Sequence, residues 1–260
     1  MLNQAELDMR INLLILAGTI EASQLAQQVS RANIQAHLSY AGRVERPKPQ
    51  PLPRRVGGFG GVEGLKRYLT ENAISHVVDA THPFAVQMSR NAADACADLN
   101  LPLLAFHRPE WKPMKGDHWT MVPDIPAAVS SLDGPTQRIM LALGRMHLGA
   151  FAAQPQHHYL LRLVDPPSTE LTLPNREIVV SRGPFTKEGD LALLREHRID
   201  LVVCKNSGGN AAVSKLVAAR ELSLPVLMIS RPKLDRERAE TDSLKAVMQW
   251  LGHLDIDLGV

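Results

Sequence analysis

The chain has 260 residues, of which 45% are apolar and 22% are charged. These fractions are typical of a globular protein with a sizeable core, and the length allows one large or two modest domains. Basic and acidic residues nearly balance, at a net charge of +2, which excludes a general nucleic-acid or membrane binder. Two cysteines cannot form a disulfide scaffold. Apolar runs fall far short of the roughly 20 residues that span a bilayer, and no leader opens the chain, so we expect a cytoplasmic protein.

Strands and helices alternate through the first half of the chain. Apolar or alternating runs predict strands at residues 11–16, 34–40, 76–79 and 103–106. Apolar spacings of three and four predict helices after the first three strands, and the third helix is expected to open at Thr81-His82-Pro83. Residues 46–53 hold four prolines and are expected to form a loop. This alternation predicts a parallel sheet with helices on its faces.

The pattern stops at residues 109–113 and then resumes, which indicates a domain boundary. We therefore expect two α/β domains, at residues 1–112 and 113–260. In the second domain, strands are expected at 138–143, 159–164, 178–181, 201–204 and 226–229. Helices are expected there at 148–152, 191–196, 213–222 and 243–251.

A turn that suits a phosphate group follows the first strand. Ala17, Gly18 and Thr19 lie where an α/β fold offers free backbone N–H groups and a helix dipole to an anion. Gly18 is the one glycine present of the three in G-x-G-x-x-G. An ordinary strand-to-helix turn therefore remains an equal alternative.

The end of the second strand indicates which dinucleotide would bind. Residues from Ser39 to Arg43 contain no acid that could hold the ribose hydroxyls. The Arg43 guanidinium could instead bind a 2′-phosphate, which favours a phosphorylated nicotinamide cofactor; the alternative is a solvated loop arginine. The glycine-rich segment 57–61, which includes Gly58, allows the close approach of a flat ligand or forms a tight turn.

The third strand ends at a polar segment, with Asp79, Thr81 and His82 at the edge where open α/β sheets bind ligands. His82 could donate a proton or bind the cofactor; alternatively, it caps the helix or orients Asp79. His107, His157 and His158 are interpreted as structural. The histidines and cysteines show no H-E-x-x-H or C-x-x-C spacing, so we expect no metal site.

The second half carries a loop that suits an anionic ligand. Lys205, Ser207 and Gly208 follow a predicted strand, but their order excludes a nucleoside-triphosphate P-loop. Arg108 and Arg145 also fall at predicted strand ends. These groups would line one cleft and bind a substrate with several carboxylates or phosphates; the alternative is scattered surface arginines.

At these residues the sequence resembles the precorrin-6A reductase family of cobalamin biosynthesis. The order and spacing of the matching segments are specific, although no single segment is decisive. The segments are residues 16–19, 21–22, 39–43, 55–61, 78–85, 91–92, 108–109, 111, 181–185, 205–209, 218–220, 225–226 and 231–232. Two departures are Ala17, where the family often has glycine, and Ser23, where it often has arginine.

The resemblance implies an NADPH-dependent enzyme that reduces one carbon–carbon double bond of precorrin-6A to give precorrin-6B. It also implies two Rossmann-like three-layer domains, with the cofactor on the first and the carboxylate-bearing tetrapyrrole in the cleft between them. We expect a monomer or homodimer with no nucleic-acid or membrane partner. The expected cofactor contacts are Ala17, Gly18, Thr19, Ser39, Arg43, Gly58, Thr81 and His82. The expected substrate contacts are Lys205, Ser207, Gly208, Arg108 and Arg145.

The expected chemistry is hydride transfer from NADPH followed by protonation of the neighbouring carbon. His82 is the first candidate for the acid, and solvent is the alternative. A redox sensor that binds NADPH without turnover would share the first-domain motifs but leaves the anion-suited loops of the second half unexplained. A sugar-nucleotide reductase or epimerase is disfavoured, because neither Tyr68 nor Tyr159 is followed by lysine four residues later.

Overall fold

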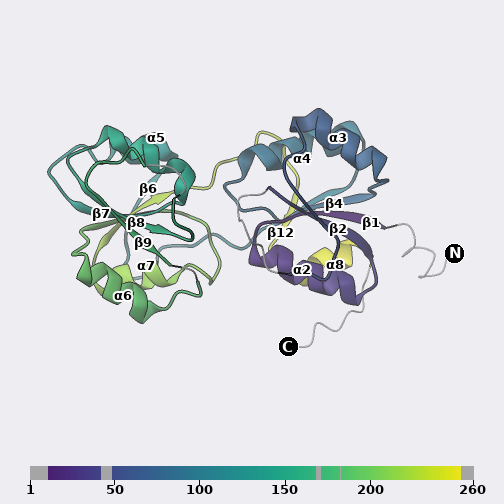
Figure 1. Ribbon diagram of the computed structural model, residues 1–260. Coiled ribbons are helices and arrows are strands. Elements are labelled where there is room, and N and C mark those ends of the chain that lie inside the picture. Colours follow the sequence, from purple (N-terminus) through teal and green to yellow (C-terminus); the bar gives the residue numbers. More distant parts are fainter. Residues whose placement is uncertain (1–10, 42–48, 168–170, 182, 253–260) are drawn as a thin grey trace. The chain divides into compact units, whose positions relative to one another are not determined.

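The computed structural model describes residues 11–41, 49–167, 171–181 and 183–252 (Figure 1). The chain divides into two compact units. Unit 1 comprises Met1–Arg108 together with Lys233–Val260, and unit 2 comprises Pro109–Pro232. Among the described helices, none combines the length and the apolar character that crossing a membrane requires.

Unit 1 is built on a six-stranded sheet of order β12-β5-β4-β1-β2-β3, in which all neighbouring strands are parallel. Helices α2 and α8 cover one face of this sheet and α3 and α4 cover the other (Figure 1). The strands are β1 (Asn12–Leu16), β2 (Gln35–Tyr40), β3 (Arg54–Val56), β4 (His76–Asp79), β5 (Leu103–Phe106) and β12 (Ala239–Thr241). The helices are α2 (Ile20–Arg31), α3 (Gly61–Glu71), α4 (Val86–Asp98) and α8 (Leu244–Trp250).

The central strand β1 is apolar at every position from Leu13 to Leu16 because both faces of the sheet are covered there. Leu13 and Ile15 pack into the core under α2 and α8, whereas Leu14 and Leu16 pack into the core under α3 and α4. Because successive side chains point to opposite faces, a strand buried on both faces must be apolar at every position.

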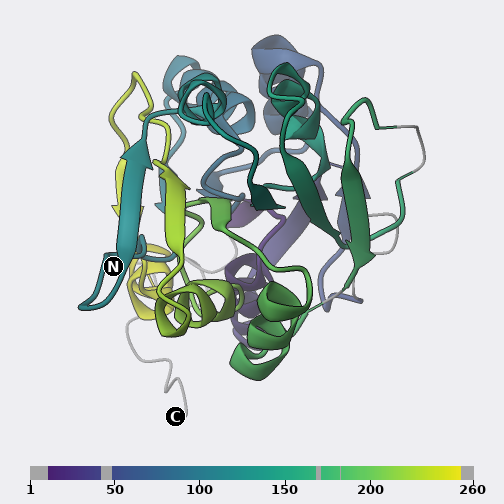
Figure 2. The same cartoon turned by 90° about the vertical axis from the view of Figure 1, so that its left-hand side faces the viewer.

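Unit 2 repeats this architecture with a six-stranded parallel sheet of order β6-β11-β10-β7-β8-β9. Helix α5 lies on one face, and α6 and α7 lie on the other (Figure 2). The strands are β6 (His118–Val122), β7 (Arg138–Ala142), β8 (His158–Leu163), β9 (Arg176–Val180), β10 (Leu201–Lys205) and β11 (Pro225–Ile229). The helices are α5 (Ile125–Ser130), the 3-10 helix η1 (Arg145–Ala153), α6 (Lys187–Glu196) and α7 (Ser214–Glu221).

The structure therefore confirms the expected α/β class with two parallel sheets. One helix start is wrong in the sequence analysis: α4 begins at Val86, not at residues 81–83. Residues 82–85 form a separate turn first, in which the Ala85 N–H donates to the His82 carbonyl at 2.7 Å. The short strands β3, β6 and β12 and the helix α5 were not expected, because their few residues are mostly polar or partly exposed.

The domain assignment of the C-terminal segment also needs correction. The sequence predicts that this segment belongs to the second domain, but β12 pairs with β5 in the sheet of unit 1. Helix α8 then buries Val247 and Met248 in the core beneath α2, and Leu251, directly after the helix, is buried there too. Apolar periodicity predicts that this segment is helical, but it does not say which sheet the helix covers.

Candidate functional site

A pocket of about 160 Å³ lies at the carboxyl edge of the unit 1 sheet. Loops that follow β1, β2, β3 and β4 form its wall, which is the edge at which open α/β sheets bind ligands. Six of the expected cofactor contacts line it, namely Ala17, Gly18, Ser39, Gly58, Thr81 and His82. Leu16, Tyr40, Ala41, Val56, Gly57, Phe59, Ala85 and Met88 complete the lining and make it largely apolar. Arg43 lies outside the described residues.

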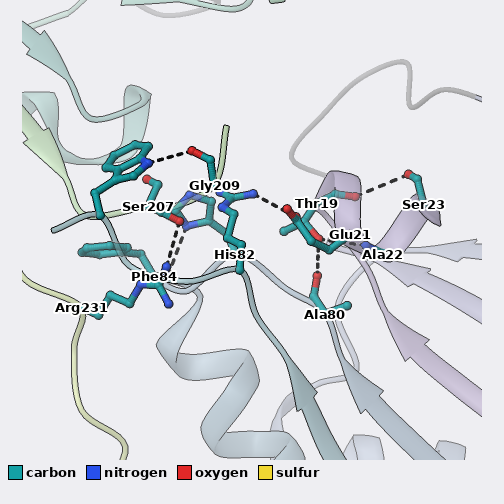
Figure 3. A network of polar contacts seen from close by, with 12 residues as sticks. Thr19, Glu21, Ala22, Ser23, Ala80, His82, Phe84, Ser207, Gly209 and Arg231 are labelled. Carbon is teal, nitrogen blue, oxygen red and sulfur yellow. Dashed lines mark hydrogen bonds and ion pairs between the residues drawn. The ribbon is translucent and has the colours of Figure 1, made fainter. Parts of the chain in front are cut away.

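The turn after β1 is shaped by Gly18 and Thr19. Gly18 has a φ of +147°, a conformation that residues with a side chain rarely adopt. The Thr19 hydroxyl caps α2 by accepting from the Ala22 N–H at 3.1 Å, and it donates to the Ala80 carbonyl at 2.8 Å (Figure 3). Thr19 thus braces the turn against the loop after β4, and it does not itself line the pocket.

Arg108, an expected substrate contact, lies in unit 1 beside the start of α2. Its guanidinium pairs with the Glu21 carboxylate at 3.1 Å, and both side chains are mostly buried. A carboxylate in the first turn of α2 would repel a bound phosphate, and the ion pair offsets that charge. The structure therefore gives Arg108 a role in the electrostatics of the turn that the sequence analysis did not foresee.

Arg55 is a residue of the pocket rim that the sequence analysis did not single out. Its guanidinium donates to the Ser39 hydroxyl at 2.8 Å and to the carbonyls of Gly57 and Gly58 at 3.0 and 2.9 Å. The guanidinium carbon also lies 3.9 Å from the centre of the Phe59 ring. Arg55 thus holds the glycine-rich loop against the end of β2. The signal available in the sequence was an arginine two residues before a glycine-rich segment.

The loop after β4 is anchored by Asp79, which is fully buried. Its Oδ1 accepts the Thr81 N–H at 3.1 Å and the Thr81 hydroxyl at 2.7 Å, and its Oδ2 accepts the Ser89 hydroxyl at 2.6 Å and bonds to Arg238. Burial alone would raise the pKa of Asp79, but Arg238, His107 and these hydrogen bonds outweigh it and hold the pKa below the ordinary value. Asp79 is therefore a carboxylate at neutral pH and not a proton donor.

His82 lines the pocket and is oriented by its own turn. Its Nδ1 accepts the Phe84 N–H at 3.2 Å. In the neutral ring the proton is therefore on Nε2, which makes that nitrogen a donor. The described contact of His82 lies in the turn before α4, whereas Thr81 binds Asp79 and no side-chain hydrogen bond caps α4 at Ala85.

The expected substrate contacts of unit 2 lie at the carboxyl edge of its sheet. Lys205 ends β10 and is buried, Ser207 and Gly208 follow it in one loop, and Arg145 is exposed at the start of η1. Gly208 is required by packing, because a Cβ there would lie 2.0 Å from the Pro109 carbonyl oxygen. The Arg231 guanidinium donates to the Ser207 carbonyl at 3.1 Å (Figure 3).

The same loop of unit 2 also forms hydrogen bonds to Trp111, in the segment with which the chain enters the unit. The Asn206 side chain accepts the Trp111 N–H at 2.8 Å and donates to the Trp111 carbonyl at 3.0 Å. The Trp111 indole donates to the Gly209 carbonyl at 2.7 Å. Within the described residues, no group of three metal-ligating side chains comes together.

Comparison with known proteins identifies the family. The family model described as "Precorrin-6x reductase CbiJ/CobK" matches residues 12–252. The precorrin-6A reductase of Rhodobacter capsulatus is 54% identical over 92% of this chain and 95% of its own length, and that of a Sinorhizobium species is 45% identical over 92% and 93%. A solved structure described as "CobK precorrin-6A reductase" is 52% identical, covers 96% of this chain and 100% of its own, and superposes with a TM-score of 0.89. The chain belongs to the CbiJ/CobK precorrin-6x reductase family.

Proposed function

We propose that this protein is the NADPH-dependent precorrin-6A reductase of cobalamin biosynthesis. Family membership across residues 12–252 supports the reductase assignment. The observation that carries the cofactor proposal is the pocket at the carboxyl edge of the unit 1 sheet. It gathers six of the expected cofactor contacts from the segments after β1 and β4, the end of β2 and one glycine-rich loop. A cytoplasmic location remains part of the proposal.

The proposed substrate is the cobalt-free macrocycle. Relatives named precorrin-6A reductase are 42–54% identical to this chain, whereas those named cobalt-precorrin-6A reductase are 28–31% identical. The difference in identity supports precorrin-6A itself as the substrate of this chain.

The residues around the pocket fit a dinucleotide. The N-terminus of α2 and the positive-φ turn at Gly18 suit a pyrophosphate, with the Glu21 charge offset by Arg108. Ser39 and Arg55 would face the 2′-phosphate end, and Arg43 remains a prediction for the same group. The apolar walls suit flat rings, and Thr81 and His82 would hold the nicotinamide end.

The residues of this chain then orient the reactants and supply charge and a proton. When bound, NADPH supplies the hydride that reduces the double bond. His82 is the proposed proton donor to the neighbouring carbon, since its Nε2 holds a proton in both ring forms. Lys205 and Arg145 are the proposed partners of the substrate carboxylates, and Ser207 and Gly208 lie in the loop that follows Lys205. Unit 2 is therefore the proposed substrate side.

The direct test is an assay of the purified protein with NADPH and precorrin-6A, in which the loss of NADPH and the macrocycle spectrum are followed together. Matched changes in both signals are expected. NADPH binding without any oxidation would overturn the reductase proposal and favour a sensor. A reaction that proceeds only with the cobalt-containing macrocycle would overturn the substrate assignment.

A variant of Arg55 tests the cofactor site. Arg55→Ala removes three hydrogen bonds and a ring contact at the end of β2, so we expect NADPH to bind roughly tenfold more weakly. The neighbouring Arg54→Ala, which changes an exposed side chain of the same strand, should bind NADPH as the parent protein does. Equal affinities for all three proteins, measured by fluorescence titration, would exclude Arg55 from the cofactor site.

A further inference from the structure

The segment that returns from unit 2 inserts one buried side chain beneath the pocket of unit 1. Arg238 lies just before β12, and its side chain is only 5% exposed. Its Nη1 bonds to the Asp79 carboxylate, which is 0% exposed, and its Nε donates to Glu240 at 3.1 Å. The buried negative charge of Asp79 is therefore met by a guanidinium that lies 159 positions later in the chain.

Asp79 links Arg238 to the wall of the pocket. Its second oxygen holds both the N–H and the hydroxyl of Thr81, and Thr81 and the adjacent His82 line the pocket. The opposite side of the loop is held by the Thr19 hydroxyl on the Ala80 carbonyl. Loop 80–82 is thus fixed between two contacts, one from the turn after β1 and one that depends on Arg238.

The neighbouring ion pairs of the return segment differ in kind. Arg236 pairs with Asp94 and Arg90 pairs with Asp235, but these four side chains are 47–86% exposed. Exposed ion pairs of this type contribute little to the stability of the fold. A buried carboxylate that loses its cation is strongly destabilised, so Arg238 and Arg236 should respond very differently to substitution.

We propose that Arg238 is a positioning residue for the reduction: by bonding to Asp79 it fixes Thr81 and His82 in the cofactor pocket. The return segment then completes the site of unit 1 rather than merely extending its sheet. The kinetic consequence rests on the proposed function, whereas the consequence for loop 80–82 does not. A lysine would keep the charge but could not bond to Asp79 and Glu240 with the planar fork that arginine offers.

The test uses the full chain with Arg238→Gln and Arg238→Lys, and Arg236→Gln as the matched control. Amide hydrogen exchange without cofactor is compared for a peptide spanning residues 79–86 and for one spanning residues 54–60. For Arg238→Gln we expect exchange at least about tenfold faster in the first peptide and unchanged exchange in the second. Arg238→Lys should be intermediate, and Arg236→Gln should match the parent protein.

Steady-state kinetics with NADPH and precorrin-6A give the second readout. Arg238→Gln should raise the KM for NADPH roughly tenfold and lower kcat, with the KM for the macrocycle unchanged. A folded Arg238→Gln protein with parental exchange at residues 79–86 and parental kinetics would overturn the proposal. If the parent protein itself fails to oxidise NADPH, the proposed function falls, while the exchange result still decides whether Arg238 holds the loop.

A double variant covers the case in which Arg238→Gln does not fold. Asp79→Asn with Arg238→Gln leaves no unpaired buried charge, so folding should recover. We expect faster exchange at residues 79–86 to persist, because neutral hydrogen bonds replace the ion pair. Parental exchange and parental KM in this folded double variant would show that the ion pair does not position the loop.

Discussion

Asp79 makes stability depend on pH. Its pKa lies below the ordinary value of 3.8 in the folded protein, because Arg238, His107 and two hydroxyl groups outweigh the effect of burial. A carboxyl group with a lowered pKa stabilises the fold above its unfolded pKa, and this contribution is lost as the pH falls through the folded pKa. The ion pair around Asp79 is therefore expected to support the fold at neutral pH and to fail in acid.

Asp79→Asn should lower the unfolding free energy at neutral pH by about 3 kcal/mol, because Arg238 loses its buried partner. It should also flatten the further loss of stability that we expect for the parent protein below pH 3.8. Urea unfolding over a pH series measures both effects. Asp98→Asn, which removes an ion pair with Lys66 on a half-exposed carboxylate, is the control and should keep the parental slope. An acid slope in Asp79→Asn equal to that of the parent would contradict the assignment.

Residue patterns predicted the pocket lining better than its supports. Gly18 and Thr81 each follow a parallel strand and Ser39 lies near the end of another. The carboxyl ends of such strands meet at one edge, so sequence position alone brought these residues together. Arg55 and Arg238 could not be found in this way. Their partners Ser39 and Asp79 lie 16 and 159 positions away, and no local pattern links the two halves of either contact.

Elements show the same division between local and distant information. The strands at residues 76–79 and 103–106 were predicted with their observed bounds. Short apolar runs that contain β-favouring residues and lie between turns can be recognised from sequence alone. Helix α8 was predicted as a helix but in the wrong unit. The apolar stripe of α8 fits a sheet face, but which of the two sheets it covers depends on the pairing of β12 with β5. The three residues of β12 are partly or fully exposed, and their sequence does not predict that pairing.

Leu251→Ala tests where α8 belongs. Leu251 is 1% exposed in the core beneath α2, so the truncation should lower the unfolding free energy of unit 1 by about 2–4 kcal/mol. Hydrogen exchange should accelerate in peptides from α2 and stay parental in peptides from α6. Val164→Ala, at a position that is 52% exposed, is the control and should change stability by less than about 0.5 kcal/mol. Acceleration in α6 with α2 unchanged would restore the domain division expected from sequence.

At the scale of the whole molecule, the chain passes between the units twice, after Arg108 and after Pro232. Both passages are anchored to the loop that follows β10. Asn206 holds the backbone of Trp111 near the first passage, and the Arg231 guanidinium donates to the carbonyls of Asn206 and Ser207 near the second. The loop that sequence analysis interpreted as an anion site thus also secures both connections, which explains why Gly208 is packed against Pro109 and Arg231.

Asn206→Ala separates cofactor binding from turnover. Asn206 is 2% exposed, and its loss leaves the Trp111 N–H and carbonyl without these bonds, at a cost of about 1–3 kcal/mol to unit 2. The lining residues of the proposed cofactor pocket all belong to unit 1, so the Kd for NADPH should stay parental. Because unit 2 is the proposed substrate side, kcat for the reduction of precorrin-6A should fall about tenfold or more. Asn175→Ala, which removes one exposed side-chain hydrogen bond to the Pro155 carbonyl, should keep both values. A parallel loss of NADPH affinity in Asn206→Ala would show that this loop acts on unit 1 and not only on the connection between the units.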